Sequence, residues 1–188
     1  MMMINTDEMS LFLSALKFSA EKHKNQRRKN SEAAPYINHP IEVADILWQK
    51  GDVCSMITIV GALLHDTLED TDATASEIKN LFGAEVLALV EEVTDDKSLP
   101  KQERKRLQIE TAAHKSSRAK QLKIADKIAN VHDIGQSPPE NWSLKRCEKY
   151  LDWSEQVVTG LRGINPKLEL HYDAVLLEAR LALSLRNE

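Results

Sequence analysis

Hydrophobic and polar residues follow one another along this chain with the spacing of amphipathic helices, and strand-like alternation is nearly absent. The first helix is predicted between about residues 6 and 26, where Leu11, Leu13, Leu16 and Phe18 occupy its apolar positions. Glycine and proline act mainly as breaks between such segments. The pattern therefore predicts an all-α fold, a bundle of roughly eight to ten helices.

Capping and helix-breaking residues set the limits of the other predicted helices. Pro40 suits the first turn of a helix that ends before Gly51, and a capping box that begins at Thr74 starts another. Ser117 is predicted to cap a later helix, and Asn165, followed by proline, to cap the last one. Beyond the first, helices are expected over about residues 39–50, 53–69, 74–83, 84–93, 100–114, 117–134, 143–161 and 165–186, with a loop over 135–142.

The length and composition are those of a soluble globular protein with one domain over residues 1–188. The formal net charge of −4 leaves no general basic face, so a nucleic-acid partner is not expected. The N-terminus lacks the features of a signal peptide, and no run approaches the roughly 18 apolar residues that a membrane span requires. Two cysteines far apart in the sequence form no metal-type pair and fit a reducing compartment. A cytoplasmic location without a membrane partner is therefore predicted.

A cluster of polar side chains closes the apolar run ITIVGALL at residues 57–64. On one continuous helix His65 and Glu69 would lie a turn apart, as would Asp66 and Asp70. Unpaired charge at the edge of a core is costly, and a bound cation offsets that cost. The alternative is a solvated helix end with acidic residues and one histidine, so ligand-type residues elsewhere must decide between the two.

Two residues far away in the sequence support the metal hypothesis. His39 stands at the start of a helix, where a histidine more often makes loop hydrogen bonds. Asp126 lies within an apolar-periodic helix, and neither Lys123 nor Lys127 is well placed to pair with it if the acid faces inwards. With the His-Asp pair at 65–66, these residues would supply two imidazoles and two carboxylates. That donor set suits Mn, Fe, Ni or Zn, and ligand type alone does not choose between them.

Five motifs, in this order, resemble one known family. The pattern His…His-Asp…Asp on separate helices is typical of HD-domain phosphohydrolases, and the motifs are similar to those of the hydrolase domain of RelA/SpoT proteins. They are QRRK at 26–29, PYINHP at 35–40, ALLHDTLEDT at 62–71, EEVTDDK at 91–97 and KIADKIAN at 123–130. The likeness covers nearly the whole chain and leaves no room for a synthetase or regulatory domain. The chain therefore resembles a stand-alone small alarmone hydrolase of the metazoan SpoT-homologue type.

The resemblance implies an HD-domain helical bundle that hydrolyses guanosine tetra- or pentaphosphate in a manganese-dependent reaction. Diphosphate would leave the 3′ position, and GDP or GTP would remain. The resemblance assigns Glu69 and Asp70 to positioning and deprotonating the attacking water, and it implies one Mn²⁺ ion per chain, held by His39, His65, Asp66 and Asp126. The physical chemistry agrees, because a divalent ion lowers the pKa of bound water and neighbouring carboxylates raise the pKa of one of the pair.

The same resemblance implies a set of substrate-binding residues. Arg28 and Lys29 match a basic pair of the family beside the substrate, although a short charged run is more often a solvated loop. Asn130 lies one turn after Asp126 and matches a residue that contacts the nucleotide, although its amide would equally suit a nearby loop. Arg146 and Tyr150, also one turn apart, match positions near ribose and phosphates, although a tyrosine at this spacing is often part of the core.

The chain departs from the family pattern at two positions of the last motif. Ala129 and His132 stand where relatives usually have an aromatic or histidine residue and an arginine. The absence of the arginine puts any salt bridge that it makes in doubt, though not the metal site. His132 faces a different direction from Asp126 on a helix and is interpreted as structural.

Two other functions stay open. One is an HD phosphatase that acts on another nucleotide, such as the 2′-phosphate of NADPH. The other is a catalytically silent HD module that binds a nucleotide or a partner protein. The presence of both Glu69 and Asp70 argues against the silent module, because binding alone does not need them. A small-molecule substrate is the expected partner, and the sequence does not reveal whether the chain forms a homo-oligomer.

Overall fold

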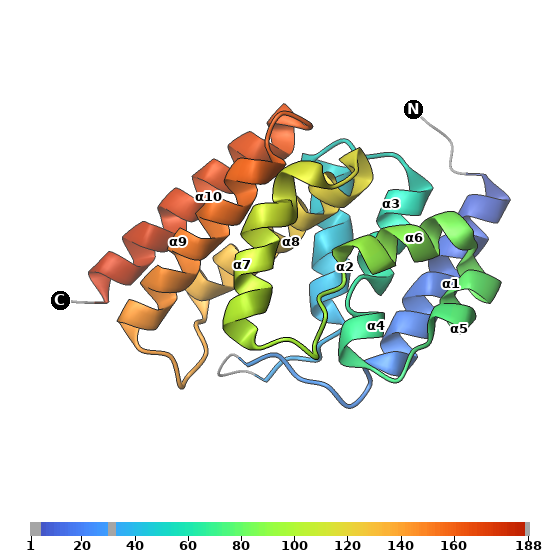
Figure 1. The fold of residues 1–188 in the computed structure, drawn as a ribbon, viewed down its shortest axis with the longest axis horizontal. Coiled ribbons are helices and arrows are strands. Elements are labelled where there is room, and N and C mark those ends of the chain that lie inside the picture. Colours follow the sequence, from blue (N-terminus) through green and yellow to red (C-terminus); the bar gives the residue numbers. More distant parts are fainter. Residues whose placement is uncertain (1–4, 30–32, 187–188) are drawn as a thin grey trace.

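Helices make up all the regular structure in residues 5–29 and 33–186, the residues that the computed structural model describes. The all-α prediction is therefore confirmed, as is the expected number of helices (Figure 1). The α-helices are α1 (Thr6–Lys22), α2 (Asn38–Asp45), α3 (Met56–Leu64), α4 (Thr67–Asp70), α5 (Ala75–Phe82), α6 (Ala84–Val93), α7 (Lys101–Thr111), α8 (Ser117–Gln136), α9 (Leu144–Leu161) and α10 (Pro166–Leu185). A π-helix, η1 (Ile46–Lys50), continues α2, and a 3-10 turn, η2 (Ala112–His114), follows α7.

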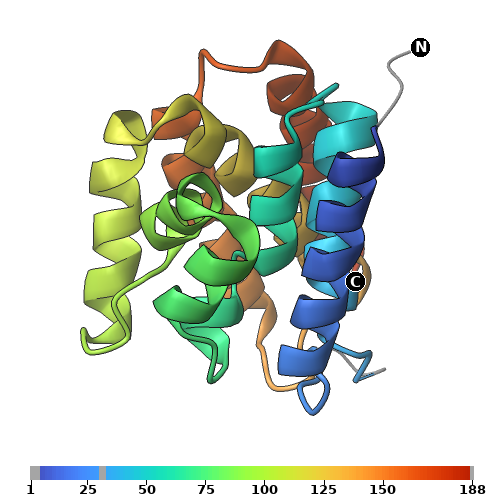
Figure 2. The same cartoon turned by 90° about the vertical axis from the view of Figure 1, so that its right-hand side faces the viewer.

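Helix α8 holds the fold together. It packs against α9 and α10 on one side and against α2, α3 and α6 on the other. Figures 1 and 2 show α9 and α10 at the opposite end of the molecule from α1 and α5. The apolar stripe predicted for this helix is fully buried, as expected for a central helix, and comprises Leu122, Ile124, Ala125, Ile128 and Val131. None of the described helices is both long enough and apolar enough to cross a membrane.

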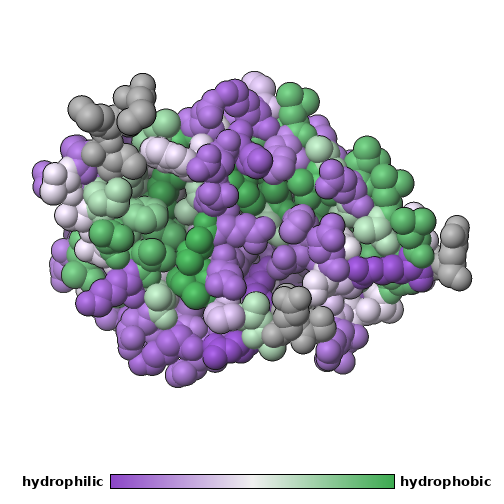
Figure 3. Space-filling model, turned by 180° about the vertical axis from the view of Figure 1, so that it is seen from behind, coloured by the Kyte–Doolittle hydropathy of each residue, from purple (hydrophilic) through white to green (hydrophobic). Residues whose placement is uncertain are grey.

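Two hydrophobic regions remain on the surface seen from behind in Figure 3. The larger lies on the side of α1 to α3, around an apolar hollow of about 300 Å³. The smaller follows α10 on the right of that view. The rest of this face is mostly polar, as the charged composition leads one to expect.

The capping residues that the sequence predicts are present with one correction. The Thr74 side chain accepts a hydrogen bond from the backbone of Glu77, and the Asn165 side chain caps α10. The prediction that Ser117 caps α8 was wrong, because the hydroxyl of Ser116 accepts the hydrogen bond from Ala119 N. Both residues are serines, so the cap moved by one position without any change in its chemistry.

Two predicted helix ends were also wrong. Helix α1 ends at Lys22, four residues early, and a tight turn then directs the chain into the loop that precedes α2. Helix α8 runs to Gln136, through the glycine that was expected to begin a loop. A Cβ atom added to Gly135 would lie 2.9 Å from the Cα of Ala179, so this glycine lets α8 and α10 approach closely.

Candidate functional site

The helix predicted over residues 53–69 is broken at the His-Asp pair. Helix α3 ends at Leu64 and α4 begins at Thr67. The hydroxyl of Thr67 donates to the carbonyl of Leu64 (2.6 Å), and His65 Nδ1 donates to the carbonyl of Ala62 (2.7 Å). These side-chain bonds compete with the helical ladder and explain the break. Asp66 and Asp70 still lie one turn apart, since Asp70 N donates to Asp66 O (2.8 Å).

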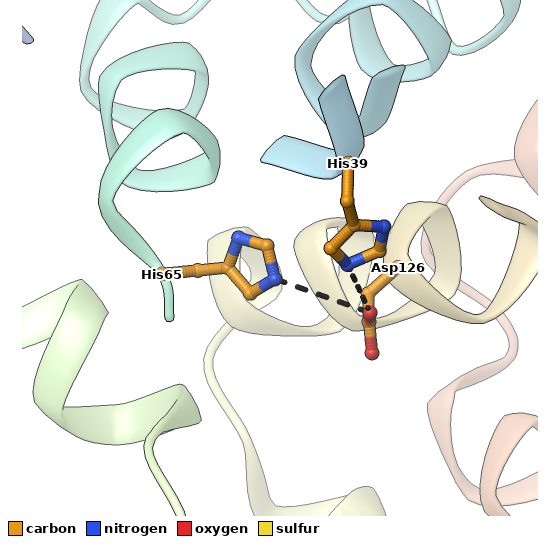
Figure 4. Close-up of side chains that lie close together, drawn as sticks. All are labelled: His39, His65 and Asp126. Atoms are coloured by element: carbon orange, nitrogen blue, oxygen red, sulfur yellow. Dashed lines mark ion pairs between the residues drawn. The ribbon is translucent and has the colours of Figure 1, made fainter. Parts of the chain in front are cut away.

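The four predicted metal ligands come together from three separate segments of the chain. His39 lies in the first turn of α2, Asp126 lies in the middle of α8, and the pair at 65–66 links α3 to α4. His39 Nε2 lies 3.2 Å from Asp126 Oδ1, and His65 Nε2 lies 3.9 Å from the same oxygen (Figure 4). Asp66 Oδ2 lies 3.1 Å from His65 Nε2 and 3.8 Å from His39 Nε2.

The Nε2 atom of His65 faces the carboxylates of Asp66 and Asp126. Its Nδ1 must carry a hydrogen, because the Ala62 carbonyl can only accept one. In a neutral ring, Nε2 then carries a lone pair. This atom is buried, has no hydrogen-bond partner and faces two carboxylates. Such an arrangement is stable only with a positive charge between these atoms. Burial opposes protonation of the ring, yet Asp66 and Asp126 raise the pKa of His65 to about 9.

The residues present therefore fit a divalent cation. His39, His65 and Asp126 are all buried, and one donor atom from each lies within 4.8 Å of the others. Despite its burial, the neighbouring imidazoles lower the pKa of Asp66, and Lys127 and His39 lower that of Asp126. Both acids are thus carboxylates, and a cation bound between them would take the place of the imidazolium proton.

Asp126 is held by partners on its own helix. Lys127 Nζ lies 2.9 Å from Asp126 Oδ2, so the prediction that neither neighbouring lysine pairs with this acid was wrong. Lys127 is buried, and its Nζ lies 4.8 Å from the ring centre of Trp153, a favourable cation–π contact. The Asn130 amide donates to Asp126 Oδ1 (2.6 Å). These contacts fix the orientation of the carboxylate towards the two histidines.

The two carboxylates predicted to handle water lie in different surroundings. Glu69 Oε2 accepts a hydrogen bond from Asp95 N (3.1 Å), and its Oε1 lies 3.4 Å from Arg104. Burial is the main cause of a raised Glu69 pKa. Asp70 instead forms an ion pair with Lys97 near the surface. A raised pKa suits Glu69 to accept a proton near neutral pH.

Tyr36 connects Asp66 of the cluster to Asp70. Its hydroxyl donates to Asp66 Oδ2 (2.7 Å) and lies 3.4 Å from Asp70 Oδ2. The ring stacks on the buried His23, and burial together with the nearby carboxylates strongly raises the pKa of the phenol. Tyr36 therefore stays a neutral donor that fixes the position of Asp66 relative to Asp70.

A cleft of about 420 Å³ adjoins these residues. Four of the five predicted substrate-binding residues line it together with Tyr36 and Asp70: Arg28, Lys29, Asn130 and Tyr150. The guanidinium of Arg28 donates to Asp133 Oδ2 (2.5 Å) and to Asn130 Oδ1 (3.1 Å). A cation, an amide and a phenol thus share a cleft next to the cluster of histidines and aspartates, which suits a phosphorylated nucleotide.

The fifth residue, Arg146, lines a second groove of about 980 Å³ between α7 and α9. The two hollows share Trp142 and Tyr150, and the guanidinium of Arg146 lies 4.2 Å from the Trp142 ring centre. Burial raises the Tyr150 pKa to about 12, so its hydroxyl remains a donor. Several more cations line this groove: Lys101, Arg104, Lys105, Arg106 and Lys149. It can therefore receive additional negative charge.

Comparison with known proteins shows which family this chain belongs to. The family described as "HD domain" matches residues 15–149. The chain belongs to the HD-domain family. Two relatives bear the name guanosine-3′,5′-bis(diphosphate) 3′-pyrophosphohydrolase MESH1. The one from Danio rerio is 49% identical over 93% of this chain and 97% of its own length, and the one from Homo sapiens is 52% identical over 86% and 90%.

A solved structure of an HD-domain relative has a closely similar fold. It is described as a metazoan ortholog of SpoT that hydrolyzes ppGpp and plays a role in starvation responses. It superposes with a TM-score of 0.89 at 44% identity and covers 95% of this chain and 98% of its own. The resemblance to metazoan SpoT homologues that the five motifs indicate is therefore confirmed.

Sequence reasoning about this HD domain missed four residues that contact the site: Tyr36, Lys97, Arg104 and Lys127. Tyr36, Lys97 and Lys127 stand within the quoted motifs, so their position beside the predicted ligands was a signal. Arg104 lies in a helix whose sequence is charged all round, and no pattern there distinguishes one cation from another. His132 is exposed, and its Nδ1 lies 3.9 Å from Glu42 Oε1; its structural role stays a prediction.

Proposed function

We propose that this chain is a metal-dependent hydrolase that removes the 3′-diphosphate of guanosine tetra- or pentaphosphate and leaves GDP or GTP. Relatives that align with almost their entire length carry this activity in their names. The structural observation that carries the proposal is the Tyr36 hydroxyl, which joins Asp66 of the metal cluster to Asp70 on the wall of the Arg28 cleft. A phosphate bound to Arg28 therefore lies next to the ligand cluster.

The metal in this proposal is one Mn²⁺ ion per chain. An HD-domain hydrolase implies a divalent cation, and the cluster of imidazoles and carboxylates suits one. We assign the ligands to His39, His65, Asp66 and Asp126. When bound, such an ion lowers the pKa of a coordinated water and offsets the charge that develops on the phosphoryl group.

The proposed reaction uses the two further acids in separate roles. Glu69, whose pKa is raised by burial, takes a proton from the attacking water. Asp70, fixed by Lys97 and Tyr36, orients that water. The water oxygen forms a bond to the inner phosphorus of the 3′-diphosphate, and the bond from this phosphorus to the 3′-oxygen breaks. The 3′-oxygen then gains a proton and diphosphate departs.

Substrate binding would depend on the residues that surround the cleft. Arg28 and Lys29 provide positive charge for the 3′-diphosphate, and Asn130 and Tyr150 offer hydrogen bonds to the nucleoside. Arg146 extends the positive charge into the second groove, where a 5′-diphosphate or triphosphate would be attracted. Burial and the neighbouring cations Arg146, Lys29 and Arg104 lower the pKa of Lys101 at the edge of this groove, and an anion there would reverse that effect.

Residues 1–188 are proposed to form one HD domain. Helix α10 lies beyond the matched residues 15–149 but packs along α8, which carries Asp126. Such packing supports a single unit rather than a separate appendage. A cytoplasmic location and the lack of a nucleic-acid partner stay predictions from the sequence.

Hydrolysis of the 2′-phosphate of NADPH is the second candidate function. The observation in its favour is the groove of about 980 Å³, which joins the cleft at Trp142 and Tyr150 and is lined by several cations. A dinucleotide with two phosphorylated halves needs more room and more positive charge than the first cleft supplies.

A panel of substrates separates these functions. The purified protein with Mn²⁺ is incubated with guanosine tetraphosphate, NADPH and a deoxynucleoside triphosphate, and released phosphate and diphosphate are measured. We expect diphosphate from guanosine tetraphosphate, whereas phosphate from NADPH alone would favour the second candidate. No release from any of them would leave a silent binding module.

Asp126→Ala should lose both metal and turnover, and Glu69→Gln should keep the metal and lose most turnover.

A further inference from the structure

The outer face of α10 carries a row of exposed leucines. Leu170, Leu177, Leu181 and Leu185 have exposed fractions of 70%, 60%, 56% and 71%, and the exposed Ala174 lies between the first two. Their spacing of three or four residues places all five on one side of the helix. The buried residues Leu168, Tyr172, Val175, Leu176, Ala179 and Leu183 cover the opposite side, which packs on the body of the protein.

This row is unusual for the surface of a monomer. Single exposed leucines are common, but these four are half of the large exposed hydrophobic side chains in the described part of the chain. Figure 3 shows the hydrophobic residues gathered along α10. Apolar residues at intervals of three and four form the face on which a second helix packs in a coiled coil.

We propose that this face of α10 pairs with the same face of a second copy of the chain, with the two helices antiparallel. The charges beside the row favour this orientation. Asp173 and Arg180 both lie on the edge of α10 next to α9. Asp173 pairs with Arg162 at the end of α9, and Arg180 pairs with Asp152 and Glu155 within α9. In an antiparallel pair, Asp173 lies opposite Arg180 of the partner subunit. A parallel pair would instead bring Asp173 close to Glu178 of the partner subunit, because opposite edges of the two helices then meet, and these like charges repel.

The register follows from the row itself. With the two-fold axis between Val175 and Leu176, Leu170 meets Leu181 of the partner subunit, and Ala174 meets Leu177 of the partner subunit. The same register places Asp173 close to Arg180 of the partner subunit, and on the other edge His171 close to Glu178 of the partner subunit. Apolar contacts and charges therefore agree on one arrangement, and the small Ala174 leaves room for a leucine at the centre.

The proposed contact leaves the active site open. None of the residues along α10 lines either hollow within the described structure. A seam of one helix per subunit is also small compared with a permanent interface, so the dimer should dissociate on dilution. Activity per chain should therefore be the same in the monomer and the dimer, which separates this proposal from the proposed function.

Sedimentation equilibrium over a range of protein concentrations tests the association. We expect a reversible dimer, which the double variant Leu177→Glu with Leu181→Glu converts to a monomer at all concentrations, with unchanged turnover. Leu81→Glu is the matched control, since Leu81 is 58% exposed on α5, and this variant should dimerise like the parent. A parent chain that stays monomeric throughout, or a dimer that survives both glutamates, would overturn the proposal.

Cysteine cross-linking tests the orientation. Cys54 is exposed and is first changed to serine, and Cys147 is buried. Leu170→Cys combined with Leu181→Cys in that background should oxidise to a covalent dimer in which position 170 is joined to position 181. Peptide mapping that finds 170 joined to 170 and 181 joined to 181 would contradict the antiparallel arrangement. The absence of a covalent dimer would contradict the contact.

Discussion

At the scale of single residues, the site depends on side chains that set the direction of other side chains. The Ala62 carbonyl fixes which nitrogen of His65 is free, and Lys127 with Asn130 turns Asp126 towards the histidines. The ligand-type residues were predictable because their types and order resemble a known family. Their orienting partners were harder to predict, because contacts such as Arg104 to Glu69 join segments that only the fold brings together.

Replacing Tyr36 tests one of these orienting contacts. Tyr36→Phe removes only the hydroxyl that donates to Asp66 and approaches Asp70. We expect Mn²⁺ affinity, measured by calorimetry, to fall about 10-fold or more, because removing a partner of a metal ligand typically has this effect. Phe18→Leu, far from the ligands in α1, is the control for a general loss of packing. Equal Mn²⁺ affinity in Tyr36→Phe and the parent would remove Tyr36 from this role.

The pH profile of turnover tests the assignment of Glu69. A base must be ionised to act, so turnover falls as the pH drops through its pKa. Burial raises the Glu69 pKa, so this fall should occur at a higher pH than for an ordinary glutamate. Arg104→Met removes a cation 3.4 Å away and should shift the fall in kcat/KM to still higher pH. Arg106→Met, whose arginine pairs with Glu103 and Glu110 on the exposed side of α7, should not shift it.

At the scale of secondary structure, periodicity and capping residues predicted the helices well, and the errors have identifiable causes. The helix break at the pair 65–66 comes from side-chain hydrogen bonds to the backbone, which periodicity does not contain. The extension of α8 through Gly135 comes from its contact with α10. A glycine in the sequence is equally compatible with a helix end and with a close approach of two helices. Which of the two it marks depends on the helix that packs beside it.

Gly135→Ala measures how closely α8 and α10 approach. Alanine normally stabilises a helix interior relative to glycine by up to about 1 kcal/mol. Here the added Cβ would lie 2.9 Å from the backbone of Ala179, which cannot rotate away. We expect the free energy of unfolding in urea to fall by about 1–3 kcal/mol. Gln136→Ala, at an exposed neighbouring position, should change little. A stabilised Gly135→Ala would show that the two helices have room between them.

At the scale of the whole molecule, the cluster of histidines and aspartates proposed to bind metal joins α2, the α3–α4 link and α8 across the core. The sequence predicted that these segments meet, because each of them supplies only one or two of the four predicted metal ligands. The clefts beside the cluster were not predictable in size, since they depend on how α7 and α9 pack.

Removing the metal should therefore destabilise the entire fold. A ligand at 100 times its dissociation constant stabilises the native state by about 2.7 kcal/mol, so saturating Mn²⁺ should raise the Tm by several degrees. A chelator should reverse this rise. Asp126→Ala should show neither effect in the same thermal scan, because it lacks a ligand. A parent Tm that does not respond to Mn²⁺ would contradict a cation that ties these helices together.

In the proposed reaction, water activated in the cluster of His39, His65, Asp66 and Asp126 attacks the inner phosphorus of a 3′-diphosphate. Hydrolysis of guanosine tetraphosphate by the Mn²⁺-loaded protein in ¹⁸O-enriched water tests it most directly, with both products analysed by mass spectrometry. The predicted result is one ¹⁸O atom in the released diphosphate and none in GDP. Label in the guanine nucleotide, or release of phosphate instead of diphosphate, would contradict the claim.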